Sequence, residues 1–214
     1  SETPLTQTAT PYPFEVIPVD VEIRELTDTK AVMVVSGVTP SFVNAIRRVL
    51  MTDIPKMAID DVEFHMGSIL SPEDNKTYES VSPLFDEIIA HRLGLVPIPT
   101  DLELFVPRDE CVCGGEGCPN CTIMYTLNKK GSATVYSGDL EPLGGPEFAI
   151  KEDLIPIVKL ADHQALLIYA TAILGHGRPH AKWQVVSGAG HKYYPTVKVD
   201  SKICDNDGAC VKAC

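Results

Sequence analysis

Seven cysteines stand in two tight groups in this 214-residue sequence. The first group places four thiols within eleven residues: Cys111, Cys113, Cys118 and Cys121. A structural zinc ion takes four ligands of this kind in a tetrahedron. Between them lie glycines, which let the backbone turn tightly around one ion: Gly114, Gly115 and Gly117. The spacing predicts a structural zinc loop, because no nearby polar group indicates an open catalytic position.

Other states of these four thiols stay open. They could be free, or joined as two disulfides in a hairpin. An iron–sulfur centre is a further alternative, but the spacing matches neither common ferredoxin run. Clustering favours a metal over disulfides, and the N-terminal residues show no secretory signal. We therefore expect a reducing environment and a cytoplasmic protein.

The second group lies at the end of the sequence and has a different spacing. The bacterial ferredoxin run is Cys-x2-Cys-x2-Cys-x3-Cys. On that template Cys204, Cys210 and Cys214 take the first, third and fourth positions, and Asp207 takes the second. This indicates a partial iron–sulfur motif. The alternative is a cysteine-bearing tail that holds no cluster.

The clearest element in the chain is a helix over 39–55. Thr39 is a candidate N-cap, and Pro40 follows at the first helical position, where a missing N–H costs nothing. Apolar residues recur along one face at helical spacing: Phe42, Ala45, Ile46, Val49 and Leu50. Pro55 ends the helix. On pattern alone this is an ordinary core helix, with solvated arginines off the stripe.

The other elements mix strands with one more helix. Strands are expected at 19–23, half-buried by its alternation, and at 31–35, 57–66, 133–136, 155–160, 165–174 and 194–199. A second helix is expected after Ser82 as N-cap with Pro83 at the first position, ending at Gly94 as a C′ glycine. Its apolar face holds Phe85, Ile88, Ile89 and Leu93. Together these elements predict an α+β fold.

Composition excludes several classes of protein. The net charge is −11, from 18 basic and 29 acidic side chains, which argues against a surface built to grip phosphates. Segment 165–174 is the longest apolar run in the later part of the chain, and it is about half the ~20 residues that cross a bilayer. Residues 1–13 are polar, contain no basic residue and are expected to form a flexible tail. We expect neither nucleic-acid nor membrane binding.

No residue set in the chain indicates catalysis. His91 is a lone helical histidine without a nucleophile beside it. His176 and His180 lie in an irregular Gly/Pro loop, where a metal site is improbable. Segment 187–192 lacks the spacing of a phosphate-binding loop. A Cys/His hydrolase therefore has no support, and no catalytic residue is assigned.

Three runs carry a family resemblance. They are Phe-x-Asn-Ala-Ile-Arg-Arg-Val-Leu at 42–50, followed by Ile-Pro and Ala-Ile-Asp; Asp-Glu-Ile-Ile-Ala-His-Arg-Leu-Gly-Leu-Val-Pro at 86–97; and His-Ala-Lys-Trp at 180–183. They closely resemble, in the same order, the alpha-type subunits of RNA polymerases, and the archaeal alpha-like subunits in particular. The eukaryotic relatives carry a zinc loop with one residue fewer between the second and third cysteines.

The resemblance implies an architecture and a role. A discontinuous dimerisation domain, 14–55 plus 177–199, would hold a large inserted mixed/β domain, 56–176, with the cysteine loop 111–121. Residues 200–214 would begin a ferredoxin-like insertion, so that this chain holds only part of a 3Fe-4S or 4Fe-4S site. The chain would be a non-catalytic assembly platform of DNA-directed RNA polymerase. Its implied partners are subunit L, the small zinc subunits N and P, and the two large catalytic subunits.

The resemblance also assigns roles along the first helix. Phe42, Ile46, Val49 and Leu50 would pack against subunit L, and Asn44, Arg47 and Arg48 would meet the second-largest subunit. The alternative class is an iron–sulfur or zinc redox protein, either an electron carrier or an oxidoreductase subunit. That alternative rests on the cysteines alone.

Overall fold

The computed structural model describes residues 18–72, 74–200, 202–205 and 207–213. The expected N-terminal tail and Cys214 lie outside the described residues. Contacts divide the chain into two compact units, 1–45 with 190–214 and 46–189. The elements in chain order are β1 Asp20–Leu26, β2 Ala31–Ser36, α1 Pro40–Thr52, β3 Lys56–Phe64, β4 Gly67–Leu70, β5 Thr77–Ser80, α2 Asp86–Gly94, β6 Thr122–Lys130, β7 Ala133–Tyr136, β8 Glu141–Pro142, β9 Pro156–Leu160, β10 Gln164–Gly175 and α3 Ala209–Ala213, with short 3₁₀ turns η1 Ser137–Asp139, η2 Pro146–Phe148 and η3 Ala181–Trp183.

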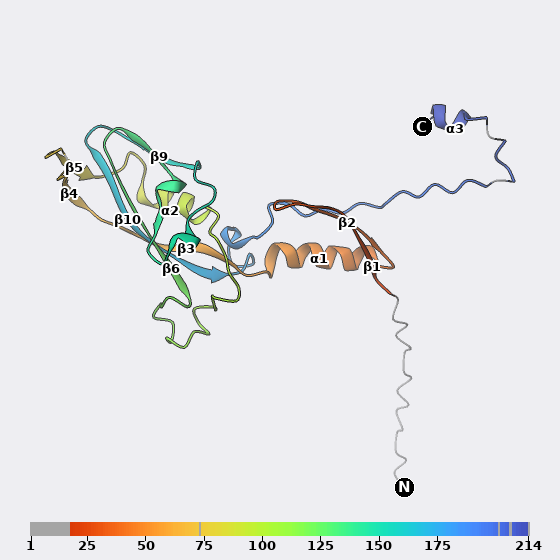
Figure 1. The fold of residues 1–214 in the computed structure, drawn as a ribbon, viewed down its shortest axis with the longest axis horizontal. Coiled ribbons are helices and arrows are strands. Elements are labelled where there is room, and N and C mark those ends of the chain that lie inside the picture. The colour runs from red at the N-terminus through yellow and green to blue at the C-terminus, as the bar shows by residue number, and fades with distance from the viewer. Residues whose placement is uncertain (1–17, 73, 201, 206, 214) are drawn as a thin grey trace, which may run out of the picture. The chain divides into compact units, whose positions relative to one another are not determined.

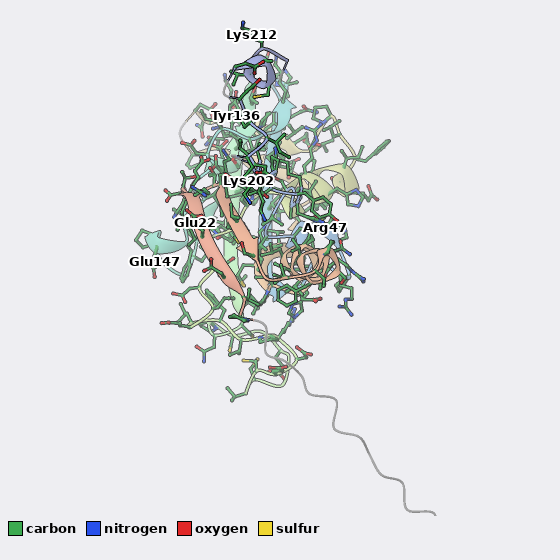
Figure 2. All side chains as sticks on the ribbon, turned by 90° about the vertical axis from the view of Figure 1, so that its right-hand side faces the viewer. Glu22, Arg47, Tyr136, Glu147, Lys202 and Lys212 are labelled. Atoms are coloured by element: carbon green, nitrogen blue, oxygen red, sulfur yellow. The ribbon has the colours of Figure 1, made fainter. Side chains whose placement is uncertain are left out.

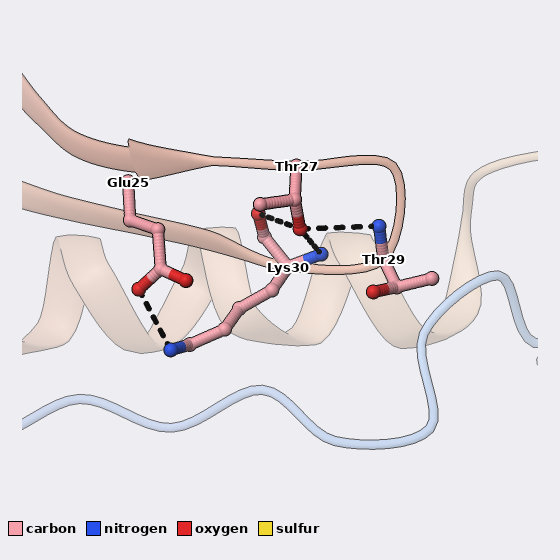
Figure 3. A network of polar contacts seen from close by, with 4 residues as sticks. All are labelled: Glu25, Thr27, Thr29 and Lys30. Carbon is pink, nitrogen blue, oxygen red and sulfur yellow. Dashed lines mark hydrogen bonds and ion pairs between the residues drawn. The ribbon is translucent and has the colours of Figure 1, made fainter.

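The first unit contains an antiparallel hairpin of β1 and β2. Its turn is closed by Thr27, whose hydroxyl accepts from the backbone N–H of Thr29 and of Lys30 (Figure 3). Lys30 Nζ lies 2.7 Å from Glu25 Oε2. Both strands were expected. The prediction that β1 is half-buried was wrong, because all seven of its residues are exposed. The alternating apolar side chains have no covering layer among the described residues of this unit.

Helix α1 follows the hairpin and confirms the sequence interpretation. The Thr39 hydroxyl accepts from the N–H of Phe42 at 3.4 Å, as an N-cap does. The helix ends at Thr52, three residues before Pro55. None of its 13 residues is buried. The expectation of an ordinary core helix therefore fails for this chain by itself.

The second unit is built on a six-stranded sheet with β10 at its centre (Figure 1). β6 pairs with β10 along one edge, and β3 pairs with the C-terminal half of β10 along the other; both pairings are antiparallel. β7 and β9 form a separate two-stranded ladder. Buried side chains recur at alternate positions along most of β6 and β10 and form the core with α2. The mixed α+β class predicted from the sequence is confirmed.

Helix α2 packs on this sheet but begins later than its punctuation predicts. It starts at Asp86, and Ser82 is not its cap, because the Ser82 hydroxyl instead binds the backbone of Leu84. Pro83 is accordingly not at the first helical position. Ile89 and Leu93 are buried as expected, whereas Phe85 is exposed. Gly94 is the last helical residue rather than a left-handed C′ glycine, and a Cβ there would lie 3.4 Å from the Ile59 carbonyl oxygen.

Strand predictions succeeded best for the long apolar runs. β3, β7, β9 and β10 lie where strands were expected, while β4, β5, β6 and β8 were missed. The missed β6 has a clear period of two in Ile123, Tyr125 and Leu127, all buried, directly after the cysteine loop. Segment 194–199 is not part of any strand.

A close contact joins the end of α1 to the segment after β10. Gly177 is buried, and a Cβ built there would overlap the carbonyl oxygen of Met51. Next to it, Arg178 donates to Asp53 Oδ1 at 2.8 Å and a His176 ring nitrogen lies 3.1 Å from the Asp53 carbonyl. Only glycine allows the two backbones to approach this closely.

Gly177→Ala is expected to destabilise the second unit by about 1–3 kcal/mol, because the added methyl group must displace the last turn of α1. The measurement is the midpoint of urea unfolding followed by Trp183 fluorescence. Gly188→Ala is the matched control, since nothing lies within 4 Å of a Cβ at that position. Equal midpoints for the two variants would contradict the contact.

Candidate metal centre and partner-binding helix

The four cysteines of the first group converge on one point. Cys111 Sγ lies 3.5 Å from Cys118 Sγ, and Cys121 Sγ lies 3.7 Å from Cys113 Sγ and 3.9 Å from Cys118 Sγ. All four sulfurs lie within 4.8 Å of one another. Four sulfurs around zinc, each at ~2.3 Å, are separated by about 3.8 Å. The geometry therefore fits a single tetrahedral ion, and none of the four thiols is joined in a disulfide in this structure.

The loop backbone is shaped for this convergence. Gly114, Gly115 and Gly117 have φ of 67°, 87° and 99°, a region that side chains other than glycine rarely adopt. The carbonyl of Cys118 accepts from the N–H groups of Cys121 and Thr122, each at 2.9 Å, so the last ligand leads directly into β6. Arg108 braces the opposite side, with its Nε donating to the Gly115 carbonyl at 2.8 Å. This brace was not anticipated, although an arginine three residues before the first ligand is visible in the sequence.

The thiols differ in acidity. Backbone N–H donation, first from Gly117, lowers the pKa of Cys113 to about 6. Burial raises the pKa of Cys121 to about 12. A metal ion needs all four as thiolates, so binding would release protons. The ion would bind the four thiolates and so cross-link the loop 111–121.

The described residues of the second cysteine group do not form a comparable cluster. Cys204 and Cys210 are exposed, and Asp207 accepts from the N–H of Ala209 at 2.9 Å at the start of α3. Among the described residues, the first group is the one set of three or more candidate ligands that comes together. Cys214 lies outside the described residues, so the iron–sulfur prediction stays a prediction.

The other predicted site residues lie on α1. Phe42, Ile46 and Val49 form an exposed apolar stripe, with 46%, 38% and 46% of their surfaces accessible. Leu50, Asn44 and Arg47 are half-buried, and Arg48 is exposed. Arg47, labelled in Figure 2, extends from the side of the helix and its guanidinium lies 3.4 Å from Met51 Sδ. The stripe and the two arginines thus occupy different faces, as the spacing predicts.

Two of the runs that carry the family resemblance, 86–97 and 180–183, meet the Ala-Ile-Asp segment at 58–60 within the second unit. Lys182 Nζ lies 2.5 Å from Asp60 and 4.3 Å from the centre of the Trp183 ring. The Trp183 indole donates to the Ile173 carbonyl, and Lys56 Nζ donates to the Lys182 carbonyl. At the end of α2, a Cβ at Gly94 would contact Lys182. The contacts of these residues connect β3, α2 and η3. Because the three elements are far apart in the sequence, the motifs alone did not predict this connection.

Comparison with known proteins agrees with this arrangement. Residues 73–201, more than half of the chain, match the family described as the RNA polymerase Rpb3/RpoA insert domain. The class is therefore that of RNA polymerase subunits with this insert. Among the described residues no helix has the length and apolarity needed to cross a membrane.

Individual relatives make the assignment narrower. The chain is 49% identical over 187 residues to DNA-directed RNA polymerase subunit Rpo3 of Thermoplasma volcanium, covering 87% of this chain and 68% of that protein. It is 48% identical over 185 residues to Rpo3 of Picrophilus torridus (86% and 68%) and 43% identical over 199 residues to Rpo3 of Methanothermobacter thermautotrophicus (91% and 69%). The chain belongs to the archaeal Rpo3 family of DNA-directed RNA polymerase subunits, and the resemblance seen in its sequence is confirmed.

Proposed function

We propose that this subunit is the non-catalytic assembly platform of its polymerase. It pairs with the smaller alpha-like subunit L, and the pair docks the small zinc subunits N and P and then the two large catalytic subunits, in the cytoplasm. The discontinuous dimerisation domain of 14–55 and 177–199 carries the pairing, and the insert 56–176 carries the cysteine loop. The observation behind the proposal is the apolar stripe of α1, which no described residue buries.

Energetics favour a partner on this stripe. Covering a large apolar side chain is worth about 1.5–3 kcal/mol relative to leaving it exposed. The stripe offers three such side chains, and β1 offers further exposed apolar residues in Val21 and Ile23. A two-stranded hairpin is marginal by itself in water. A protein partner that covers these residues would stabilise both elements at once.

The proposed zinc ion at Cys111, Cys113, Cys118 and Cys121 has a structural role. Native mass spectrometry of the chain co-expressed with subunit L, under anaerobic conditions, tests both parts together. The expected species is a one-to-one heterodimer with one zinc ion. A monomer that carries iron and sulfide would instead support the redox alternative, for which the described residues of the second cysteine group supply no clustered ligand set.

Arg47→Ala is expected to leave the heterodimer with L intact and to weaken recruitment of the second-largest subunit by at least about tenfold. The reason is that a guanidinium fork can pair with a carboxylate or backbone carbonyls of a partner. Arg47→Lys is the matched variant, which keeps the charge but loses the guanidinium fork. Its recruitment of the second-largest subunit should lie between that of the unchanged chain and that of Arg47→Ala. The measurement is stepwise reconstitution on a sizing column; dissociation of the heterodimer itself would contradict the assigned role.

A further inference from the structure

The outer face of the six-stranded sheet, opposite α2, is only partly covered. Side chains of β10 alternate, so that Tyr169 and Thr171 point to this outer face while Ile168 and Ala170 are buried on the inner one. At the Gly175 end the face is closed by Trp183, whose ring would overlap a Cβ on that glycine. Towards Tyr169 the described residues supply no such cover, and 43% of the Tyr169 surface is accessible.

The register places an aromatic and a methionine at the middle of the open part. Tyr169 faces Thr126 of β6, and Met124 is the diagonal neighbour two residues away, at about 7–8 Å. Met124 has 45% of its surface accessible. Both side chains come from strands with neighbours on both sides, so this is not an edge effect. A solvated sheet face normally carries polar residues at such positions.

Carboxylates frame this centre. Glu63 lies beside Tyr169 and Asp61 beside Thr171 on β3, and Glu141 of β8 pairs with Thr126 on the opposite side. All three are exposed. In the described part of the chain none of the three forms an ion pair. Acidic groups on both sides of an exposed ring attract cations to its face.

At the Gly175 end of the sheet the chain itself supplies a cation to β3. There Lys182 of η3 pairs with Asp60, the residue next to Asp61, and its ammonium lies over the Trp183 ring. A basic side chain and a flat ring together thus close the sheet over β3. The open half offers acidic residues of the same strand and an aromatic ring, and in the described part of the chain no cation pairs with its carboxylates.

We propose that the open half, defined by Asp61, Glu63, Met124, Tyr169 and Glu141, docks a basic segment of another polymerase subunit. An arginine or lysine of that segment stacks on Tyr169 and pairs with the carboxylates, as Lys182 does with Asp60. The inference rests on the proposed function in one respect, namely that the segment belongs to a fellow subunit.

The test uses the assembled polymerase with p-benzoylphenylalanine in place of Tyr169. Irradiation is expected to give an adduct with another subunit, and peptide mass spectrometry is expected to find arginine or lysine beside the attachment point. Asp61→Lys combined with Glu63→Lys should lower the adduct yield at least about tenfold at low salt, and the difference should shrink at high salt because screening weakens exposed charge pairs. If the double variant still pairs with L but is no longer incorporated into the polymerase, that result would support the proposal as well.

Matched positions separate this surface from general exposure. The photoreactive residue at Leu154, which is 76% exposed, and the reversal Asp162→Lys should give no such adduct and no such loss. An adduct at 169 with an uncharged or acidic segment, an absent adduct, or a yield unaffected by the double reversal would overturn the proposal. Failure of the isolated wild-type chain to pair with L would instead count against the proposed function, and that pairing is measured separately, before the polymerase is assembled for cross-linking.

Discussion

Replacing Ile46 by glutamate is expected to abolish the heterodimer with subunit L, lowering its affinity at least about 100-fold. The substitution puts a carboxylate at the centre of the stripe of Phe42, Ile46 and Val49. Burying an unpaired charge costs far more than a lost contact, and central interface positions carry most of the binding energy. Ile46 is 38% exposed in the free chain, so the fold should tolerate the change. Affinity is measured by titrating labelled L into each variant.

The control for this prediction is Ser41→Glu, which adds the same charge to the same helix. Ser41 is exposed and lies about 100° around the helix from Phe42. The affinity of the Ser41 variant for L should stay within about twofold of that of the unchanged chain. Its free energy of unfolding should match that of the Ile46 variant within about 0.5 kcal/mol. Equal binding by the two variants would place the partner elsewhere on the chain.

Removing one thiol of the cysteine loop is expected to have the second large effect. Cys113→Ser should reduce the metal content from one ion per chain to below about a tenth, because a structural site depends on all four ligands. Amide exchange across 107–121 should then accelerate, since the binding free energy of the ion is also folding free energy for the loop, about 10 kcal/mol or more in small zinc modules. Cys113 is half-buried, so its loss leaves little cavity. Metal content is measured by elemental mass spectrometry after gel filtration.

Two further variants give this experiment its meaning. Cys121→Ser removes a fully buried ligand and should show the same metal loss together with a packing cost. Cys204→Ser changes an exposed thiol outside the cluster and should retain the ion. Full metal content in Cys113→Ser would contradict the four-thiolate site. Metal loss in Cys204→Ser would show that the ion depends on a cysteine outside that site.

Local punctuation and short spacing carried the successful sequence predictions. Thr39 and Pro40 define the start of α1, and four thiols within eleven residues must converge when glycines allow the turns. The same reasoning failed at Ser82, because the hydroxyl of this serine binds the backbone of its own turn, four residues before the first helical residue. It failed for β1 because alternation predicts which residues share a face and not whether that face is covered within the same chain.

Long-range pairing was out of reach of the sequence. Nothing local to Tyr169 says that Glu63 lies on one side of it and Thr126 on the other, about 100 and 40 residues away, because register depends on the whole sheet. The junction of Lys182 with Asp60 is of the same kind. The three family-like runs could be recognised as motifs, but the contacts of Asp60, Gly94 and Lys182 that join β3, α2 and η3 appear only in three dimensions.

The pairing of Lys56 with Gly175 has a consequence for how such chains can change. These two residues are the first of β3 and the last of β10, and they face each other at about 5 Å across an antiparallel ladder. The two ends of segment 57–174 therefore lie side by side. A segment with adjacent ends can be lengthened, trimmed or exchanged at an entropic cost that grows only slowly with its length. We therefore expect exposed loops within 57–174 to tolerate changes in length as long as Lys56 and Gly175 stay paired.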